Sequence, residues 1–407
     1  MNIGLLHYTC PPFVGGVEEI LRQQASLFHR YYHPVKILAG NGGHFADEYE
    51  IEINPLLSSR NIRIQRLQRN AKENIDKIML YSKRILRYLR KSLEYIDVLI
   101  AHNVITMPYN LPLTIALHRL AEDKKIISWN HDSPYFYESY SPTLDDEPWN
   151  ILKEYDDDIY YVTISDSRAE EFRKLYGLKE KLRVIPNGID PIQFFQLERT
   201  TVRLIQENNL FSSDLILVQP SRLHPRKNIE LSIKVLSALH EKGVSAKLLL
   251  TGAYDPHEKK NKDYYYHLRR LIRNLGLDDY VIIVAEYRFE DGEKMTADRI
   301  TMRDLYLISD ILFLPSTQEG FGIPLIEAGM IKLPVFCSTI PPFKSIGREN
   351  VYYFNVDDPP EKIAEQIIKV TSNLKPHRMY RYVINNLVWD NIYLNILKPF
   401  LEEVVND

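Results

Sequence analysis

The sequence predicts an α/β protein built from two doubly wound domains. Short runs rich in β-branched residues alternate with helical periodicity along most of the chain, which is typical of parallel sheets covered by helices on both faces. The alternation occurs as two successive series, and a chain of 407 residues is long enough for two or three domains. Each series is therefore interpreted as one Rossmann-like domain.

The first series contains seven predicted strands. They cover residues 2–8, 35–39, 62–67, 98–103, 125–131, 159–165 and 182–186. Apolar residues at helical spacing predict helices between these strands, at 17–30, 75–93 and 166–176.

The second series repeats the scheme. Its predicted strands cover residues 215–220, 246–251, 281–285, 310–315, 335–338 and 351–355, and its clearest helices cover 229–241, 264–275 and 361–373. The strand pattern lapses near 196–213, so we expect one domain over 1–198 and a second over 199–385. Residues 386–407 carry an amphipathic helix that either closes the second domain or returns to the first.

Composition excludes several classes of protein. The net charge of −3 does not indicate a nucleic-acid-binding protein. Cys10 and Cys337 are too few and too far apart for a disulfide framework or a zinc site, which favours a reducing, cytoplasmic location. The first residues lack the features of a signal peptide, and no apolar run of about 18 residues is present to span a membrane.

Unusual residues follow the predicted strands, where ligands bind in open α/β sheets. Gly15 and Gly16 stand between the first strand and the first helix, where their backbone could approach a phosphate or simply form a tight turn. The pattern is not GxGxxG, so a nicotinamide dinucleotide is not indicated. His131 ends a strand and could present its ring to a ligand or act as a general base, or it could bond a neighbouring backbone group.

The strongest candidates lie in the second series. Arg222, Arg226 and Lys227 crowd a strand-to-helix loop, where cations and a helix dipole together favour a pyrophosphate. Residues 316–328 read STQEGFGIPLIEA, and the glycines free the backbone to contact a ligand. Glu319 precedes the helix and Glu327 lies one turn inside it, where carboxylates can accept hydrogen bonds from sugar hydroxyls.

Taken together, these segments resemble those of the retaining family-4 glycosyltransferases, also called glycosyl transferases group 1, which have the two-domain GT-B architecture. The segments that carry the resemblance are PPFVGGVEE, NHDSPYF, VTISDSRAEEFRKLYGLKEKLRVIPNGIDPIQF, SRLHPRKN and EGFGIPLIEA. They extend from residue 11 to residue 328. The resemblance implies an active site in a cleft between the domains and a C-terminal helix, including Trp389 and Asp390, that crosses back to the first domain.

The resemblance also implies roles for the residues of the second domain. Arg222 and Lys227 would bind the diphosphate of a nucleotide-sugar donor. Glu319, with the backbone of Gly320, Phe321 and Gly322, would hold the donor sugar. Glu327 would bind the ribose hydroxyls.

The first domain would bind the acceptor and complete the donor site. Gly15 and Gly16 would approach the donor phosphates, and His131 would contact the sugar near the reacting carbon. The cations would stabilise the leaving diphosphate in place of a divalent metal, so neither a metal nor a permanently bound cofactor is expected. The acidic run 156–158 precedes a strand and is interpreted as a solvated turn rather than a metal site.

Residues 60–91 form a basic segment with eleven Lys or Arg and two acids, a balance of +9. Its helix could pack its apolar face on the sheet with the cations in solvent, lie on an anionic membrane, or attract an anionic acceptor.

Three functions follow from these observations. The first is a retaining hexosyltransferase that uses a donor of the GDP-mannose or UDP-glucose type and a small, anionic acceptor. The second is the same transfer to a lipid-linked or polysaccharide intermediate at the inner membrane face. The third is a non-catalytic nucleotide-sugar-binding protein, which the complete set of candidate residues disfavours. A sugar-nucleotide epimerase shares the architecture, but the EGFGIPLIEA spacing favours transfer.

Overall fold

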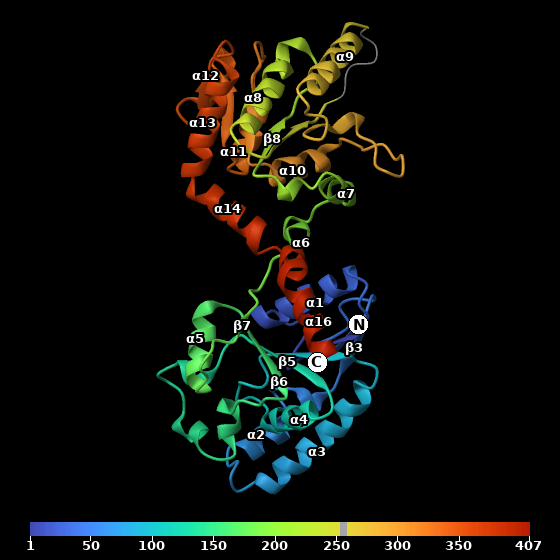
Figure 1. Cartoon of the computed structure of the whole chain (residues 1–407), viewed down its shortest axis with the longest axis vertical. Helices are drawn as coiled ribbons and strands as arrows, with labels where there is room; N and C mark the ends of the chain where they lie inside the picture. The colour runs from blue at the N-terminus through green and yellow to red at the C-terminus, as the bar shows by residue number, and fades with distance from the viewer. Residues whose placement is uncertain (253–258) are drawn as a thin grey trace. The chain divides into compact units, whose positions relative to one another are not determined.

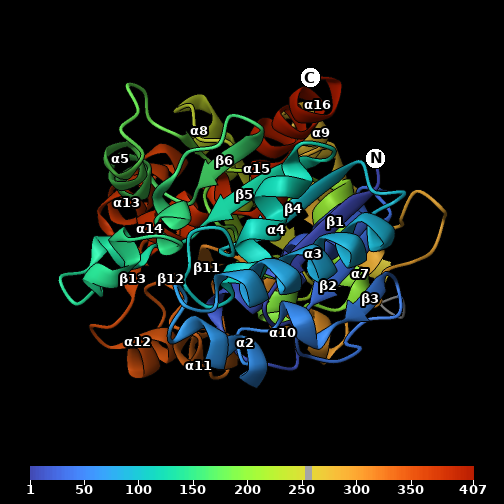
Figure 2. The ribbon, with the colours of Figure 1, turned by 90° about the horizontal axis from the view of Figure 1, so that it is seen from below.

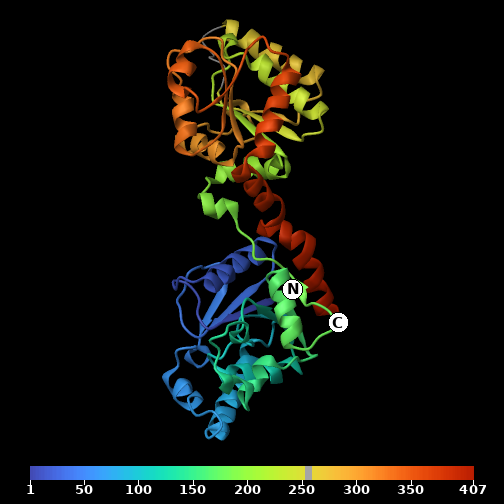
Figure 3. The ribbon, with the colours of Figure 1, turned by 90° about the vertical axis from the view of Figure 1, so that its left-hand side faces the viewer.

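The computed structural model describes residues 1–252 and 259–407. The chain forms two compact units (Figure 1). Unit 1 comprises residues 1–190 and 386–407, and unit 2 comprises residues 191–385. Both ends of the chain therefore lie in unit 1 (Figure 3).

Unit 1 contains a seven-stranded parallel sheet in the order β3-β2-β1-β4-β5-β6-β7. The central strands lie side by side in this order in Figure 2. The strands are β1 (Ile3–His7), β2 (Val35–Ala39), β3 (Glu50–Ile53), β4 (Val98–His102), β5 (Lys125–Asn130), β6 (Ile159–Thr163) and β7 (Arg183–Val184). The longer helices are α1 (Gly16–Arg30), α2 (Ile62–Gln68), α3 (Ile75–Ser92), α4 (Leu111–Ala121) and α5 (Asp166–Leu175).

Alternate residues of these strands enter two different cores, because successive side chains of a strand point to opposite faces of the sheet. Leu5 and Ile100 face a core that includes α1 and the C-terminal helices. Leu6 and Leu99 face a core that includes α3, α4 and α5. The doubly wound fold predicted from sequence is thus confirmed for this unit.

The C-terminal segment completes unit 1. It consists of α15 (Trp389–Ile392), the π-helical turn η8 (Tyr393–Leu397) and α16 (Lys398–Asn406). Trp389 is fully buried and its indole N–H donates to Gln23 of α1 at 2.6 Å. The segment therefore packs on unit 1, which is one of the two arrangements that the sequence left open.

Unit 2 contains a six-stranded parallel sheet in the order β10-β9-β8-β11-β12-β13. The strands are β8 (Leu215–Gln219), β9 (Ala246–Leu250), β10 (Val281–Ile283), β11 (Ile311–Leu314), β12 (Val335–Ser338) and β13 (Tyr352–Phe354). The helices are α6 (Pro191–Phe195), α7 (Arg199–Glu207), α8 (Ile229–Glu241), α9 (Lys259–Asn274), α10 (Arg299–Ile308), α11 (Ile323–Met330), α12 (Pro341–Gly347), α13 (Pro360–Asn373) and α14 (Lys375–Asn386). Two cores again cover opposite faces of the sheet.

Residues 191–198 lie in unit 2 rather than with the residues before them. The backbone N–H of Glu198 donates to Asp304 at 2.8 Å, and the Arg303 guanidinium donates to the carbonyl of Gln196 at 3.0 Å. These bonds attach residues 196–198, which follow α6, to helix α10.

One predicted strand is wrong. Residues 62–67 form helix α2, and the third strand of the unit is β3 instead. Asn61 caps this helix, since its side-chain oxygen accepts from the backbone N–H groups of Arg63 and Ile64. Only Ile64 of this helix is buried, whereas Ile62 is exposed, so the apparent alternation did not mark a sheet face.

Candidate active site

The structure brings most of the predicted site residues of unit 2 together in one cavity, whereas Gly15, Gly16 and His131 of unit 1 follow two different strands of its sheet. In unit 2, a cavity of about 460 Å³ lies where the loops after β8 and β11 meet. It is lined by Pro220, Ser221, Arg222, Leu223, His224, Arg226, Lys227, Glu319, Phe321, Gly322, Ile323 and Pro324. Both strands end at the carboxyl edge of the sheet, where open α/β sheets bind ligands.

Hydrogen bonds within unit 2 shape the loop after β8. The Gln219 amide donates to the carbonyl of Lys227 at 3.0 Å and accepts from the Ser232 hydroxyl at 2.6 Å. The carbonyl of Arg226 accepts from the backbone N–H of Thr317 at 2.8 Å, which joins this loop to the loop after β11. The loop after β8 is therefore bonded both to the buried Gln219 of its own strand and to the backbone of the loop after β11.

Lys227 and Glu319 form an ion pair in this cavity. Lys227 Nζ lies 2.5 Å from Glu319 Oε1, and the two side chains are only 14% and 13% exposed. The Ser316 hydroxyl donates to the same carboxylate oxygen at 2.8 Å. Arg222 also lines the cavity but is exposed, so its guanidinium is accessible to a ligand.

The glycine turn before α11 has one position that requires glycine. Gly322 has φ of +117°, and a Cβ there would lie 3.1 Å from the ring of Phe343. Gly320 has no such constraint, since a Cβ there would meet nothing within 4 Å. Phe321 between them is 57% exposed. The turn thus presents backbone and one aromatic ring to the cavity.

Glu327 lies outside the set of residues that line this cavity. It lies in α11, one turn beyond the glycines, and its carboxylate accepts from the Tyr306 hydroxyl at 2.8 Å. Burial and the neighbouring Glu327 carboxylate raise the pKa of the Tyr306 phenol. The structure therefore assigns Glu327 a partner that the sequence did not indicate.

In unit 1, three histidines lie at the carboxyl ends of three adjacent strands. His7 ends β1, His102 ends β4, and His131 directly follows β5. His7 Nδ1 lies 2.6 Å from the carbonyl oxygen of His102, and His102 Nδ1 lies 3.4 Å from His131 Nε2. Only His131 was selected from the sequence, because its neighbours become visible only once the strand order is known.

Two asparagines position His131. The Asn103 side chain accepts from the backbone N–H groups of His131 and Asp132, at 3.1 and 2.9 Å. Asn103 itself has φ of +51°, a conformation that asparagine tolerates better than most residues. Asn187 Nδ2 lies 3.4 Å from His131 Nδ1.

The pKa of each histidine in this row lies below its ordinary value. Burial, with a smaller contribution from His7, lowers the pKa of His131 to about 3. Burial likewise lowers the pKa of His102 and of His7. A neutral imidazole suits a hydrogen bond better than proton storage, and a ligand that bonds His131 would replace one of its two 3.4 Å contacts, with His102 or with Asn187.

Neither glycine of the first loop of unit 1 is required by its surroundings. A Cβ at Gly15 would lie 2.2 Å from Glu18 Oε2, which the flexible Glu18 side chain can relieve by moving, and a Cβ at Gly16 would meet nothing within 4 Å. The Glu18 carboxylate accepts from the Thr9 hydroxyl beside it. Glu18 thus lies at the N-terminus of α1, next to the position expected to approach a phosphate.

The acidic run 156–158, interpreted from the sequence as a solvated turn, pairs with a histidine. Asp156 Oδ2 lies 2.7 Å from His118 Nδ1, and the run precedes β6. Among the residues that the structure describes, no group of three or more His, Cys, Asp or Glu side chains is placed to hold a metal ion.

The eleven cations of residues 60–91 are all exposed. The apolar residues of α3, including Ile85 and Leu89, are buried in the core of unit 1. The packed-helix interpretation therefore accounts for the apolar face, and the cations remain accessible. Over residues 1–252 and 259–407, every helix lacks either the length or the apolar character needed to cross a membrane.

Comparison with known families agrees with this arrangement. Residues 14–193 match the model of Glycosyltransferase Family 4, and residues 202–386 match the model of Glycosyl transferases group 1. Together the two matches cover nearly the whole chain. The chain is a glycosyltransferase whose two domains match these two family models. The predicted GT-B fold and enzyme class, a hexosyltransferase, are thereby confirmed.

This glycosyltransferase is similar in sequence to several enzymes with assigned names. The mannosylglucosylglycerate synthase of Petrotoga mobilis is 26% identical over 84% of this chain and 84% of its own length. The enzyme of the same name from Thermotoga maritima is 24% identical over 85% and 82%. The O-antigen chain mannosyltransferase RfbU of Salmonella typhimurium is 29% identical over 56% and 54%.

Proposed function

We propose that this glycosyltransferase moves a mannosyl group, with retention of configuration, from a nucleotide-sugar to a hydroxyl of a small, anionic acceptor. The names of three relatives support mannose as the first choice of sugar, with GDP-mannose as the first donor and UDP-glucose as the second. Two of those names also contain glycerate, which supports a glycosylated hydroxy acid as the acceptor or product class.

The observation that carries the proposal is the Lys227–Glu319 pair beside Arg222 in one cavity. Two cations and a carboxylate in a partly buried site suit a ligand with an anionic diphosphate joined to a polyhydroxylated sugar. Lys227 and Arg222 would bind the diphosphate, and Glu319 would accept hydrogen bonds from the hexose. The glycine turn at 320–322 would leave room for the sugar.

The transfer breaks the bond between the anomeric carbon and the phosphate oxygen and forms a bond from that carbon to the acceptor oxygen. Negative charge builds on the leaving diphosphate, where Arg222 and Lys227 would stabilise it in the transition state. The acceptor proton would pass to the leaving phosphate as the acceptor attacks from the same face. His131, held neutral, would orient the donor sugar by a hydrogen bond and would not store a proton.

The direct test is nucleotide release from a panel of donors, with and without glucosylglycerate. GDP-mannose should give the fastest turnover, and NMR of the product should show the anomeric configuration of the donor. Turnover should persist after treatment with EDTA, because Arg222 and Lys227 would stabilise the leaving diphosphate without a divalent metal ion. An inverted product, or no turnover with any donor, would contradict the proposal.

A second candidate, transfer to a lipid-linked acceptor at a membrane face, is favoured by the exposed cations of residues 60–91. Because the apolar face of α3 is buried, such an attachment would be electrostatic. Flotation with anionic liposomes at low salt, lost at high salt and absent with neutral liposomes, would support this candidate over a small acceptor.

A further inference from the structure

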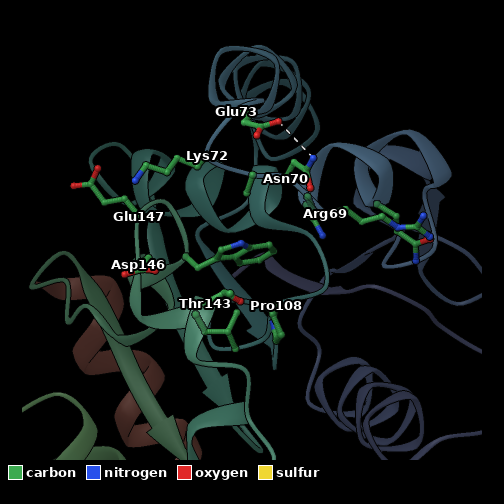
Figure 4. Close-up of a pocket in the computed structure, with 13 residues that line it drawn as sticks. Arg69, Asn70, Lys72, Glu73, Pro108, Thr143, Asp146 and Glu147 are labelled. Atoms are coloured by element: carbon green, nitrogen blue, oxygen red, sulfur yellow. Dashed lines mark hydrogen bonds between the residues drawn. The ribbon is translucent and has the colours of Figure 1, made fainter.

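A second cavity, of about 720 Å³, lies in unit 1 (Figure 4). We propose that it binds the neutral glycosyl part of the acceptor. It is lined by Gln65, Gln68, Arg69, Asn70, Ala71, Lys72, Glu73, Pro108, Thr143, Leu144, Asp146, Glu147 and Trp149. Its volume falls within the roughly 300–1,000 Å³ range of small-molecule sites. The inference rests on the proposed function, since it specifies the acceptor of the same reaction.

The cavity has an apolar wall with an aromatic ring. Trp149 is partly buried and packs against a small apolar cluster that includes Ala71 and Leu111. The buried residues of this cluster come from the turn between α2 and α3, from α3 and from α4. A flat indole fixed in this way can pack against the C–H face of a pyranose ring and has an N–H donor at its edge. The wall therefore suits a sugar ring.

The polar rim favours a neutral ligand. Gln65, Asn70 and Thr143 offer both hydrogen-bond donors and acceptors, as sugar hydroxyls require. Among the charged lining residues, three are acids (Glu73, Asp146 and Glu147) and two are cations (Arg69 and Lys72). The local balance is thus −1, so the lining itself has no excess of cations with which to select an anion.

The polar groups surround the cavity rather than cluster on one side. Asp146 and Glu147 lie on one side of the cavity in Figure 4, and Arg69 and Asn70 lie on the other. Asn70 also donates to Glu73, at 3.4 Å. A ligand in the cavity would therefore meet hydrogen-bonding groups on opposite sides, which fixes its orientation.

The cavity adjoins the carboxyl edge of the unit 1 sheet. Pro108 is in the loop after β4 and Thr143 is in the loop after β5, and these strands lead into His102 and His131. The Thr106 hydroxyl donates to the carbonyl of Asp132 at 2.8 Å, which ties the two loops together next to His131. Two of the three segments that line the cavity thus follow the strands that carry His102 and precede His131, and the third segment is residues 65–73.

Tryptophan fluorescence provides a test with a local signal. Of the three tryptophans, Trp129 and Trp389 are fully buried and Trp149 is partly exposed. Titration of the full chain with methyl α-glucoside and with maltose should change the emission of Trp149. The change should persist in 0.5 M salt, since a neutral ligand releases no counterions. Glycerol 3-phosphate and glycerate serve as anionic comparison probes.

Variants locate the binding. Trp149→Ala should abolish the fluorescence change, and ligand-observed NMR should show maltose affinity reduced at least about tenfold. Asn70→Ala, which keeps the reporter, should weaken maltose binding by about two- to tenfold through loss of one hydrogen bond. Tyr95→Ala is the matched control, because Tyr95 is 80% exposed in unit 1 and does not line the cavity.

The outcomes separate this inference from the proposed function. Binding of neutral sugars that falls in Trp149→Ala and Asn70→Ala, but not in Tyr95→Ala, supports it, whatever the donor panel shows. Binding of anionic probes alone, with loss at high salt, overturns it. So does the absence of any sugar binding in a protein that still releases nucleotide from its donor.

Discussion

Lys227 Nζ and Glu319 Oε1 are 2.5 Å apart, so the cation expected to bind the donor diphosphate is paired with the carboxylate expected to bind the donor sugar. The pair is largely buried and comes from two loops that follow neighbouring strands, β8 and β11. A diphosphate would therefore compete with Glu319 for Lys227. Because of this competition, an experiment can distinguish the role of Lys227 from that of Glu319.

Glu319→Gln should affect free nucleotide and nucleotide-sugar in opposite ways. Without the carboxylate, Lys227 is released to bind the diphosphate, so the affinity for free GDP or UDP should stay constant or rise by a few-fold. Affinity for the nucleotide-sugar and its turnover should fall by at least about tenfold, because the hexose loses a charged hydrogen-bond acceptor. Isothermal titration with both ligands checks this, and equal losses for both would contradict the assigned role.

Gly322→Ala should destabilise unit 2. The left-handed backbone at φ +117° and the contact with Phe343 predict a loss of about 1–3 kcal/mol in the free energy of unfolding. Gly320→Ala is the matched control in the same turn, and it should change stability by less than about 0.5 kcal/mol. Urea unfolding of both variants measures the difference, and equal effects would contradict the conformational argument.

The buried histidine row should make stability depend on pH. The pKa of His131 is about 3 in the folded chain, below the value of about 6.5 in the unfolded chain, so the unfolded state binds more protons between these values. Stability should therefore fall as pH decreases from 6.5 towards 3, by about 1.4 kcal/mol per pH unit for this histidine.

His131→Asn should flatten this dependence. The variant loses the titrating group while it keeps a polar side chain of similar reach. Urea unfolding at several pH values between 7 and 4.5 compares its slope with that of the wild type. Identical slopes would show that His131 is not held neutral in the folded protein.

The parts of the site that lie close together in sequence were predictable. Arg222 and Lys227 share one loop, and Glu319 to Gly322 form one turn, so strand-end position and residue type were sufficient to select them. The meeting of these two loops depends on the adjacency of β8 and β11, which alternating strands and helices allow but do not specify.

The parts that depend on strand order or local capping were not predictable. His7 and His102 join His131 only because β1, β4 and β5 are neighbours in the sheet. Apolar and polar residues alternate over residues 62–65, as in a strand. The Asn61 side chain nevertheless caps a helix there, and the alternation does not reveal this cap. The unit 1 cavity combines three segments far apart in the chain.

The most direct measurement is the affinity and turnover of the double variant Arg222→Gln/Lys227→Met with GDP-mannose and UDP-glucose. Lys234→Gln, an exposed cation on α8 outside the cavity, is the control. Loss of two charge-assisted contacts predicts at least about a 100-fold fall in nucleotide-sugar affinity and a larger fall in turnover, with the control unchanged. Wild-type affinity and turnover in a folded double variant would contradict the account.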